Sequence, residues 1–415
     1  MHWFTAVFLI ALGVATAARL WLARRQVAHI AAHRAAVPSE FVGRITLEAH
    51  QKAADYTVAK TRLGAFETFV EVALLLALTF GGLLQAVSAA VSTAFRPESY
   101  TYGVALIVCV VVLSSLVDLP FSLYRVFGIE SRFGFNRMDL RLFFTDLAKQ
   151  VALGAAIGIP LLYLVLWLMD RMDQAWWIYV WLTLVAYSLI AQIIYPTVLA
   201  RWFNKFSPLE DETLKSRIET LVSKCGFRAK GLFVMDGSKR SSHGNAYFTG
   251  FGATKRIILF DTLVSRLRPP EVEAVLAHEL GHFSLHHVWK RLFVAFAVSL
   301  AMLWILSQLA RHTWFYEALG VHTQSTAAAL LLFSLIAPAF MFFLHPLSSV
   351  YSRRHEYEAD AFAARHADAS DMIHALVKLY QDNAATLTPD PLHSAFYDSH
   401  PPAVLRIARL QAQQR

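Results

Sequence analysis

The chain has 415 residues, of which 56% are hydrophobic and only 16% charged, and its mean hydropathy is +0.44. These values exclude an ordinary soluble protein and indicate an integral membrane protein. The net charge of +8 does not indicate a nucleic-acid partner, because the lysines and arginines flank apolar runs and no nucleic-acid-binding motif accompanies them.

Apolar runs that could cross the membrane follow one another along the chain. The first has no basic residue ahead of it, which a signal peptide needs, so we expect it to remain as a membrane helix. Runs long enough to cross about 30 Å of hydrocarbon cover residues 3–22, 66–91, 102–121, 151–169, 176–199, 292–309 and 325–344. The sequence therefore predicts a mostly α-helical polytopic membrane protein with seven transmembrane helices.

Lysine and arginine are distributed unevenly among the connections between these runs. The connections after the first and third runs are strongly basic, as are the long connection before the sixth run and the tail. By the positive-inside rule the N-terminus lies outside and both polar segments lie in the cytoplasm. The compact, alanine-rich chain with short outer loops further suggests a bacterial inner membrane.

We expect four parts along the chain. Residues 1–199 form the first five membrane helices with their loops, 200–291 a cytoplasmic segment, 292–347 the last two membrane helices and 348–415 a cytoplasmic tail. The polar segments together form a small α+β cytoplasmic domain.

The cytoplasmic segment starts with a pattern typical of a surface helix. Apolar residues recur at helical spacing over 211–227 and end at a glycine. GLFVMD, NAYFTG and RIILFD then predict three strands of a small antiparallel sheet. The glycine-rich run GSKRSSHGNAYFTGFG has neither of the spacings of nucleotide-binding loops, so we expect no nucleotide partner.

Acidic residues also occur inside the apolar runs, at Glu67, Glu71 and Asp118. An unpaired charge in the bilayer costs several kcal/mol, so these side chains must face the bundle interior, water or a partner. Two interpretations remain open here: they line a pathway for ions or substrate, or they hold helices together.

The motif HELGH lies in the run PPEVEAVLAHELGHFSLHH, which predicts a helix that begins at a proline and continues into the sixth membrane helix. His278 and His282 are four residues apart on one helical face, so both can bind one zinc ion at about 2.1 Å. Glu279 can take a proton from zinc-activated water and return it to a leaving amine. The alternative is a polar helix end at the membrane surface.

A catalytic zinc needs a third protein ligand, and SRRHEYEADAFAARH follows the seventh apolar run. Its candidates are Glu356, Glu358, Asp360 and, as a less favoured alternative, His355. Glu356 and Asp360 share a helical face, whereas Glu358 points elsewhere and is expected as a solvated charge. We expect two more histidines, His286 and His287, at the membrane surface.

With these motifs the chain resembles the type I CAAX prenyl endopeptidases, seven-span integral membrane zinc metalloproteases. The resemblance rests on the number of spans, the insertion before the sixth span, and the order of GSKRSSHGNAYFTGF, KRIILFDTL, HELGH, RRHEYEADAFA and HPPAVLRI. It implies a zinc metalloendopeptidase for CAAX-type C-terminal processing or related membrane and peptide substrates. Its partners would be the lipid bilayer and a peptide or protein, with or without a prenyl group.

The resemblance also implies roles at the metal. His278, His282 and Glu356 would bind one zinc ion, and Glu279 would act as general base and acid. Asp360 would orient a ligand histidine from behind.

For the substrate, the resemblance implies two further pairs of residues. Asn245 and Ala246, at the edge of the sheet, would bind the substrate backbone as an added strand. His400 and Arg406 would steady the substrate or the oxyanion of the reaction. Without the resemblance, SHPP is only a turn before a helix and Arg406 a surface cation. The resemblance also implies that the membrane spans enclose a water-filled chamber.

Other functions fit parts of the pattern. Seven helices with buried acids and a histidine-rich mouth would suit a membrane transporter or metal carrier, but no internal repeat supports one. A shorter heat-shock-type quality-control membrane protease shares HELGH but has fewer spans, and a noncatalytic metal-stabilised scaffold would bind zinc without turnover.

Overall fold

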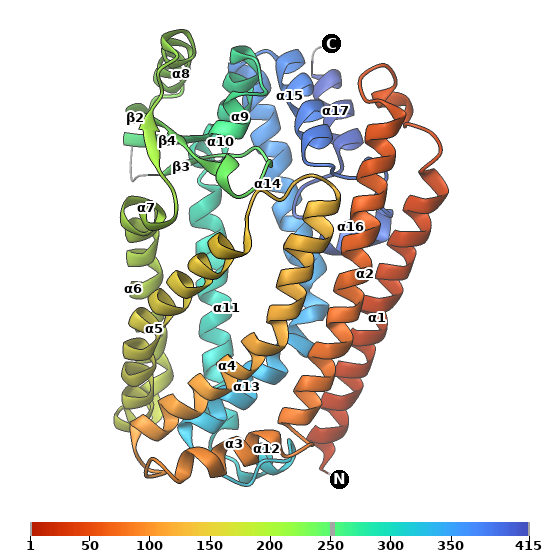
Figure 1. Ribbon diagram of the computed structural model, residues 1–415. Coiled ribbons are helices and arrows are strands. Elements are labelled where there is room, and N and C mark those ends of the chain that lie inside the picture. The colour runs from red at the N-terminus through yellow and green to blue at the C-terminus, as the bar shows by residue number, and fades with distance from the viewer. Residues whose placement is uncertain (1, 250–253, 414–415) are drawn as a thin grey trace.

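Long apolar helices make up most of the chain, which a computed structural model describes over residues 2–249 and 254–413. The N-terminus lies at one end of the helical bundle, and a smaller layer of helices and strands covers the other end (Figure 1). The mostly α-helical membrane architecture expected from the sequence is confirmed.

Six of the described helices are long and apolar enough to cross a membrane. Their main segments are α1 (Trp3–His33), α4 (Tyr100–Leu123), α5 (Leu140–Arg171), α6 (Trp176–Ile194), α11 (His287–Leu309) and α13 (Thr326–Met341). Helix α13 continues through a short 3-10 turn into the polar helix α14 (His345–His366).

The second expected span is not one continuous helix. The chain forms α2 (Leu47–Leu78) and α3 (Leu83–Ser92), which meet at 55°. The break lies at Gly81 and Gly82, and Gly82 has a φ of 73°, which glycine adopts without strain. The count reaches seven spans when this bent pair is taken as one. Helix α3 and α12 (Thr313–Glu317) both lie at the N-terminal end of the bundle (Figure 1).

The sheet is mixed rather than antiparallel. Its strands are β1 (Phe206–Pro208), β2 (Arg228–Met235), β3 (Ala246–Thr249) and β4 (Thr254–Phe260), in the order β1-β2-β4-β3. Strands β2 and β4 are parallel, and the outer pairs are antiparallel. The physical reason is the apolar run Ile257 to Leu259, which is almost fully buried and therefore takes a central place, leaving β3 at the edge. Residues 250–253, where the strand NAYFTG and the glycine-rich run were expected to end, lie outside the described residues.

Shorter helices complete this end of the bundle. They are α7 (Ala200–Phe203), α8 (Glu212–Lys224), α9 (Asp261–Val264), α10 (Pro269–Ser284), α15 (Ala369–Asp382), α16 (Pro391–Tyr397) and α17 (Ala403–Ala412). The expected surface helix is α8, which Asp211 caps at the start. One apolar core, which includes Ile218, Leu259, Leu276 and Phe362, joins α8, the sheet, α10 and α14.

The sequence predicts that the HELGH helix continues into the sixth membrane helix. The structure shows a break between the two. Helix α10 ends at Ser284 and α11 begins at His287. Between them His286 has a φ of 59°, in the left-handed region, so the helical path stops and restarts. The two helices still follow one another along the bundle (Figure 1).

Candidate metal centre

Three side chains from two helices meet at the end of the bundle opposite the N-terminus. His278 and His282 lie on α10, and Glu356 lies on α14. The two histidine Nε2 atoms are 3.3 Å apart. His278 Nε2 lies 3.4 Å from Glu356 Oε2, and His282 Nε2 lies 3.5 Å from Glu356 Oε1. Two imidazoles and one carboxylate thus face one point.

A glycine lets the two helices approach this closely. A Cβ atom on Gly281 would lie 3.0 Å from the Cβ of Phe362 and 3.1 Å from the Cα of Ala359. Any larger residue would push α10 away from α14 at the turn that carries the histidines. The glycine of HELGH therefore brings Glu356 to the pair of imidazoles.

The three donors fit a divalent metal ion. Glu356 is 2% exposed, and its Oε2 accepts no hydrogen bond from the described residues, which is costly for a buried carboxylate oxygen. The separations match the spacing of about 3.4 Å expected for ligands of a tetrahedral zinc ion with bonds near 2.1 Å. Two histidines and a glutamate also form a common catalytic zinc set that leaves a fourth position open.

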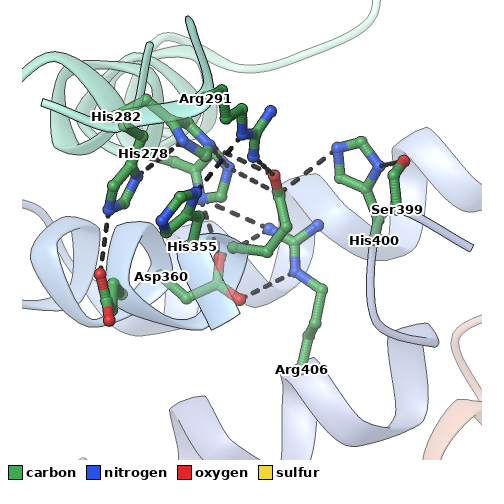
Figure 2. Close-up of polar contacts among 11 residues, drawn as sticks. His278, His282, Arg291, His355, Asp360, Ser399, His400 and Arg406 are labelled. Atoms are coloured by element: carbon green, nitrogen blue, oxygen red, sulfur yellow. Dashed lines mark hydrogen bonds and ion pairs between the residues drawn. The ribbon is translucent and has the colours of Figure 1, made fainter. Parts of the chain in front are cut away.

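Behind His278 lies a buried carboxylate that an arginine holds in place. His278 Nδ1 lies 2.9 Å from Asp360 Oδ1, and Asp360 accepts two hydrogen bonds from Arg406 of α17 (Figure 2). Arg406 is 6% exposed, so it is not the surface cation that its sequence alone suggests. Burial acts to lower the pKa of His278, but the nearby carboxylates of Asp360 and Glu356 outweigh it and raise the pKa to about 9.

His282 has a different partner behind it. Burial and the nearby His278 lower the pKa of His282 to about 3, so this imidazole is neutral. Its Nδ1 lies 3.0 Å from Nδ1 of His287. His287, which was expected at the membrane surface, is buried within the protein at 1% exposure. His286, by contrast, is exposed.

The remaining ligand candidates of α14 point away from the trio. His287 Nε2 lies 3.0 Å from Glu358 Oε2. Glu358 is partly solvated, as expected, but it also pairs with the buried His287. His355 accepts a hydrogen bond of 3.4 Å from Arg291 through its Nδ1. Its ring stacks on His287, with centroids 4.1 Å apart. His355 therefore belongs to a neighbouring cluster.

Glu279 follows His278 on α10, as the motif requires. Burial raises the pKa of its carboxyl, and Glu356 adds to this, while His278 and Arg406 act in the opposite direction. A carboxyl group with a raised pKa can accept a proton and return it near neutral pH. This property suits a general base that later acts as an acid.

Two more cationic or titratable side chains reach the carboxylate of Glu356. His400 Nε2 lies 3.4 Å from Oε2, and His400 is oriented by Ser399, whose Oγ is 3.0 Å from its Nδ1. Arg291 Nη2 lies 3.5 Å from Oε1 (Figure 2). Arg291 was not among the expected site residues. Its approach to Glu356 depends on the turn at His286, for which the sequence gives no signal.

The edge of the sheet lies close to the HELGH helix. Ala246 opens the edge strand β3, and its N–H donates to the side-chain oxygen of Asn245 over 2.8 Å. The ring of Phe248 in the same strand contacts Phe283 of α10, with centroids 5.9 Å apart. Asn245 also lines a cavity of about 820 Å³ together with Tyr56, Arg240 and His243. The edge strand that Ala246 opens thus contacts the helix that bears the histidines.

The acidic residues of the membrane helices have partners and also line cavities. Glu67 pairs with Arg125, and Glu71 lies 3.7 Å from Arg19. Both acids and Asp118 line a cavity of about 400 Å³, and Asp118 lines a second one of about 730 Å³. Helix contacts and a polar interior therefore occur together, and the two interpretations are not exclusive.

Comparisons with known proteins cover almost the whole chain. Residues 26–205 match the family model "CAAX prenyl protease N-terminal, five membrane helices", and residues 208–414 match "Peptidase family M48". The CAAX prenyl protease 1 homolog of Arabidopsis thaliana is 34% identical over 386 residues, which are 91% of each chain.

Relatives from other organisms give the same result. CAAX prenyl protease 1 of Saccharomyces cerevisiae is 40% identical over 72% of this chain and 69% of its own. The Homo sapiens homolog is 33% identical over 77% and 76% of the two chains. The crystal structure of Ste24p from S. mikatae covers 99% of both chains with a TM-score of 0.92 and 30% identity. The likeness includes the membrane helices and the end of the bundle that holds the three donors.

Proposed function

We propose, from the premise that the chain belongs to peptidase family M48 and is a multi-pass membrane zinc metalloprotease related to the CAAX prenyl proteases, that His278, His282 and Glu356 hold its one zinc ion. The observation that carries this assignment is the oxygen of Glu356 that is buried without a hydrogen bond. It faces the Nε2 atoms of both motif histidines at metal-ligand spacing.

The reaction is hydrolysis of a peptide bond. A bound zinc ion supplies a Lewis acid with one open position, which acidifies water and polarises a carbonyl group. Glu279 takes a proton from the attacking water and delivers it to the leaving amine. His400, which is well exposed and close to Glu356, steadies the substrate or its developing oxyanion. The guanidinium of Arg406 is engaged by Asp360, so we assign it to orienting His278.

The substrate backbone adds to the edge of the sheet. In the pairing with β4, Tyr247 lies opposite Ile258, and the N–H of Phe260 donates to the carbonyl of Asn245. Residues of an antiparallel strand alternate in direction, so the backbone groups of Ala246 face away from β4. A peptide that binds there extends the sheet as a fifth strand. Peptides with a CAAX-type C-terminus are the substrate class that the relatives' names suggest, with or without a prenyl group.

The active site faces the cytoplasm. The N-terminus lies at the opposite end of the bundle from α10 (Figure 1), and the connections at the α10 end are rich in lysine and arginine. The positive-inside rule then places the N-terminus outside. The compact, alanine-rich chain favours a bacterial inner membrane as its location.

The experiment is a cleavage assay on the purified full chain in detergent. An internally quenched peptide that ends in a CAAX sequence is cleaved by the wild type, and a chelator stops cleavage until zinc is restored. Glu279→Gln retains one zinc ion and an unchanged Tm but does not cleave. Cleavage by Glu279→Gln at the wild-type rate would overturn the mechanism. Zinc uptake into proteoliposomes without any cleavage would instead indicate a metal carrier.

A further inference from the structure

The two motif histidines are supported in parallel but unequal ways. Each points Nε2 at the metal centre and Nδ1 away from it. The outer Nδ1 of His278 meets the carboxylate of Asp360 directly. The outer Nδ1 of His282 meets another imidazole, that of His287, and only then a carboxylate, that of Glu358. A metal-binding histidine commonly donates its second ring N–H to a carboxylate or another acceptor, which fixes its orientation.

We propose that His287 and Glu358 are positioning residues, which hold His282 in the tautomer and orientation needed to bind the metal. The hydrogen-bonded chain is His282 Nδ1 to His287 Nδ1, at 3.0 Å, and His287 Nε2 to Glu358 Oε2, at 3.0 Å. This inference rests on the proposed function to the extent that it takes His282 as a metal ligand. It adds residues to which neither the motif nor the assigned ligand set gives a role.

The chain of contacts permits one arrangement of protons when a metal is bound. A neutral imidazole has one N–H and one lone pair. If Nε2 of His282 binds the ion, its proton lies on Nδ1 and is donated to the Nδ1 lone pair of His287. His287 then has its proton on Nε2, which donates to the carboxylate of Glu358. The negative charge of Glu358 thus determines, two links away, which nitrogen of His282 is free for the metal.

The fold holds His287 in this place from several sides. The left-handed turn at His286 ends α10 and brings His287, at the start of α11, next to the ring of His282, with ring centroids 5.1 Å apart. The ring of His355 stacks on the other side at an interplanar angle of 10°. Glu358 is held by Arg354, whose Nε donates to Oε1 over 3.0 Å. This support resembles that of Asp360 by Arg406.

A second metal ion is the competing explanation, because donor atoms of His287, His355 and Glu358 lie within 4.8 Å of one another. The stacked rings argue against it. A metal ion lies near the plane of each imidazole that binds it, and two nearly parallel rings 4.1 Å apart do not share such a position. A metal on Nε2 of His287 would also leave its proton on Nδ1, facing the Nδ1–H of a metal-bound His282.

The test measures zinc affinity of the purified full chain by competition with a chromophoric chelator. His287→Phe preserves a stacked ring but removes the acceptor for His282, and we expect zinc binding to weaken about 10- to 100-fold. Glu358→Gln retains an acceptor without the charge, so its loss should be smaller. The visible spectrum of the cobalt-substituted protein should shift in His287→Phe, because the ligand geometry changes.

Two neighbouring histidines provide matched controls. His286→Asn removes the exposed imidazole of the preceding residue and tolerates its left-handed backbone. His355→Phe retains the stack but removes one donor of the cluster. Both should bind zinc as the wild type does, with one ion per chain. Unchanged zinc affinity and cobalt spectrum in His287→Phe would overturn the proposal. Two ions per wild-type chain that fall to one in His355→Phe would replace it with a second metal site.

The outcome is separable from that of the cleavage assay. A wild-type chain that binds one zinc ion but cleaves no peptide would contradict the proposed peptidase, yet the affinities of the four variants would still decide the role of His287. Conversely, full zinc affinity in His287→Phe together with cleavage would leave the peptidase intact and remove the positioning chain.

Discussion

Arg406 donates two hydrogen bonds to Asp360, from Nε to Oδ2 over 2.8 Å and from Nη2 to Oδ1 over 2.6 Å. Both side chains are almost fully buried, and Asp360 in turn contacts His278. A helix near the C-terminus therefore reaches the HELGH motif, more than a hundred residues earlier in the chain, through one ion pair. The proposed metal centre therefore depends on three helices rather than on the two that carry its proposed ligands.

Replacement of Arg406 should therefore damage both stability and metal binding. Arg406→Ala leaves the buried Asp360 carboxylate without its partner, which costs about 3 to 5 kcal/mol. Arg406→Lys restores the charge but not the two-point geometry, so it should rescue only in part. Tm values in the presence of a chelator measure the stability, and chelator competition measures the zinc affinity. Arg409→Ala, on the exposed face of the same helix, is the control, and equal losses in both variants would contradict the prediction.

Gly281→Ala should separate α10 from α14. The added methyl group would meet Phe362 and Ala359 at 3.0 and 3.1 Å, and forced overpacking costs about 1 to 3 kcal/mol. We expect a lower Tm and weaker zinc binding together, because Glu356 moves away from the histidines. In Gly64→Ala nothing lies within 4 Å of the new atom, and the helix should gain stability. A Gly281→Ala protein with wild-type zinc affinity would show that the close approach is not needed.

Glu271 should make stability dependent on pH. It caps the start of α10, accepting from the N–H of Arg268 at 2.8 Å and from Lys378 at 2.6 Å. Burial acts to raise its pKa, but these hydrogen bonds outweigh it and lower the pKa below the ordinary value of 4.5.

A lowered folded-state pKa means that the stabilisation is complete above the ordinary pKa of glutamate and is lost as the pH falls through the lowered value. Glu271→Gln removes this dependence. The difference in Tm between the wild type and Glu271→Gln should be several degrees at pH 7 and should shrink as the pH falls below 4.5. The exposed Glu48→Gln serves for comparison. A difference that stays constant with pH would contradict the assignment.

Ala246→Pro should weaken substrate binding more than catalysis. Proline removes the outward N–H of the edge strand, which donates to the side-chain oxygen of Asn245 in the free chain. It removes none of the bonds to β4, because Ala246 does not donate to that strand, and proline is tolerated at the first position of an edge strand. We expect KM to rise about tenfold, the equivalent of one lost hydrogen bond of about 1.4 kcal/mol, with a smaller change in kcat. Ala246→Gly retains the N–H and should have a nearly normal KM. A large fall in kcat at normal KM would exclude strand addition there.

Local spacing was sufficient to predict the parts of the site that lie on one helix. His278 and His282 share a face whatever the fold, and Glu279 must lie beside them. The choice between Glu356 and Asp360 depends on how α14 faces α10, and spacing left it open. The structure turns Glu356 toward both Nε2 atoms and Asp360 toward Nδ1 of His278.

Features that depend on a single backbone turn were not predictable. The left-handed conformation of His286 directs His287 inward and Arg291 toward Glu356, yet a histidine gives no signal for such a turn. Gly81 and Gly82 do give a signal, but a continuous apolar run concealed the bend between α2 and α3. The place of β4 in the sheet follows from its apolar run, which the strand prediction recognised without giving the order of the strands.

Each helix that supplies a ligand leads directly into the bilayer, α10 into α11 and α14 back into α13 (Figure 1). The proposed ion would therefore connect the water-facing ends of two membrane helices. Removal of the ion by a chelator in the aqueous phase should accelerate deuterium uptake by the backbone of both membrane helices, most strongly at the ends nearest the ion.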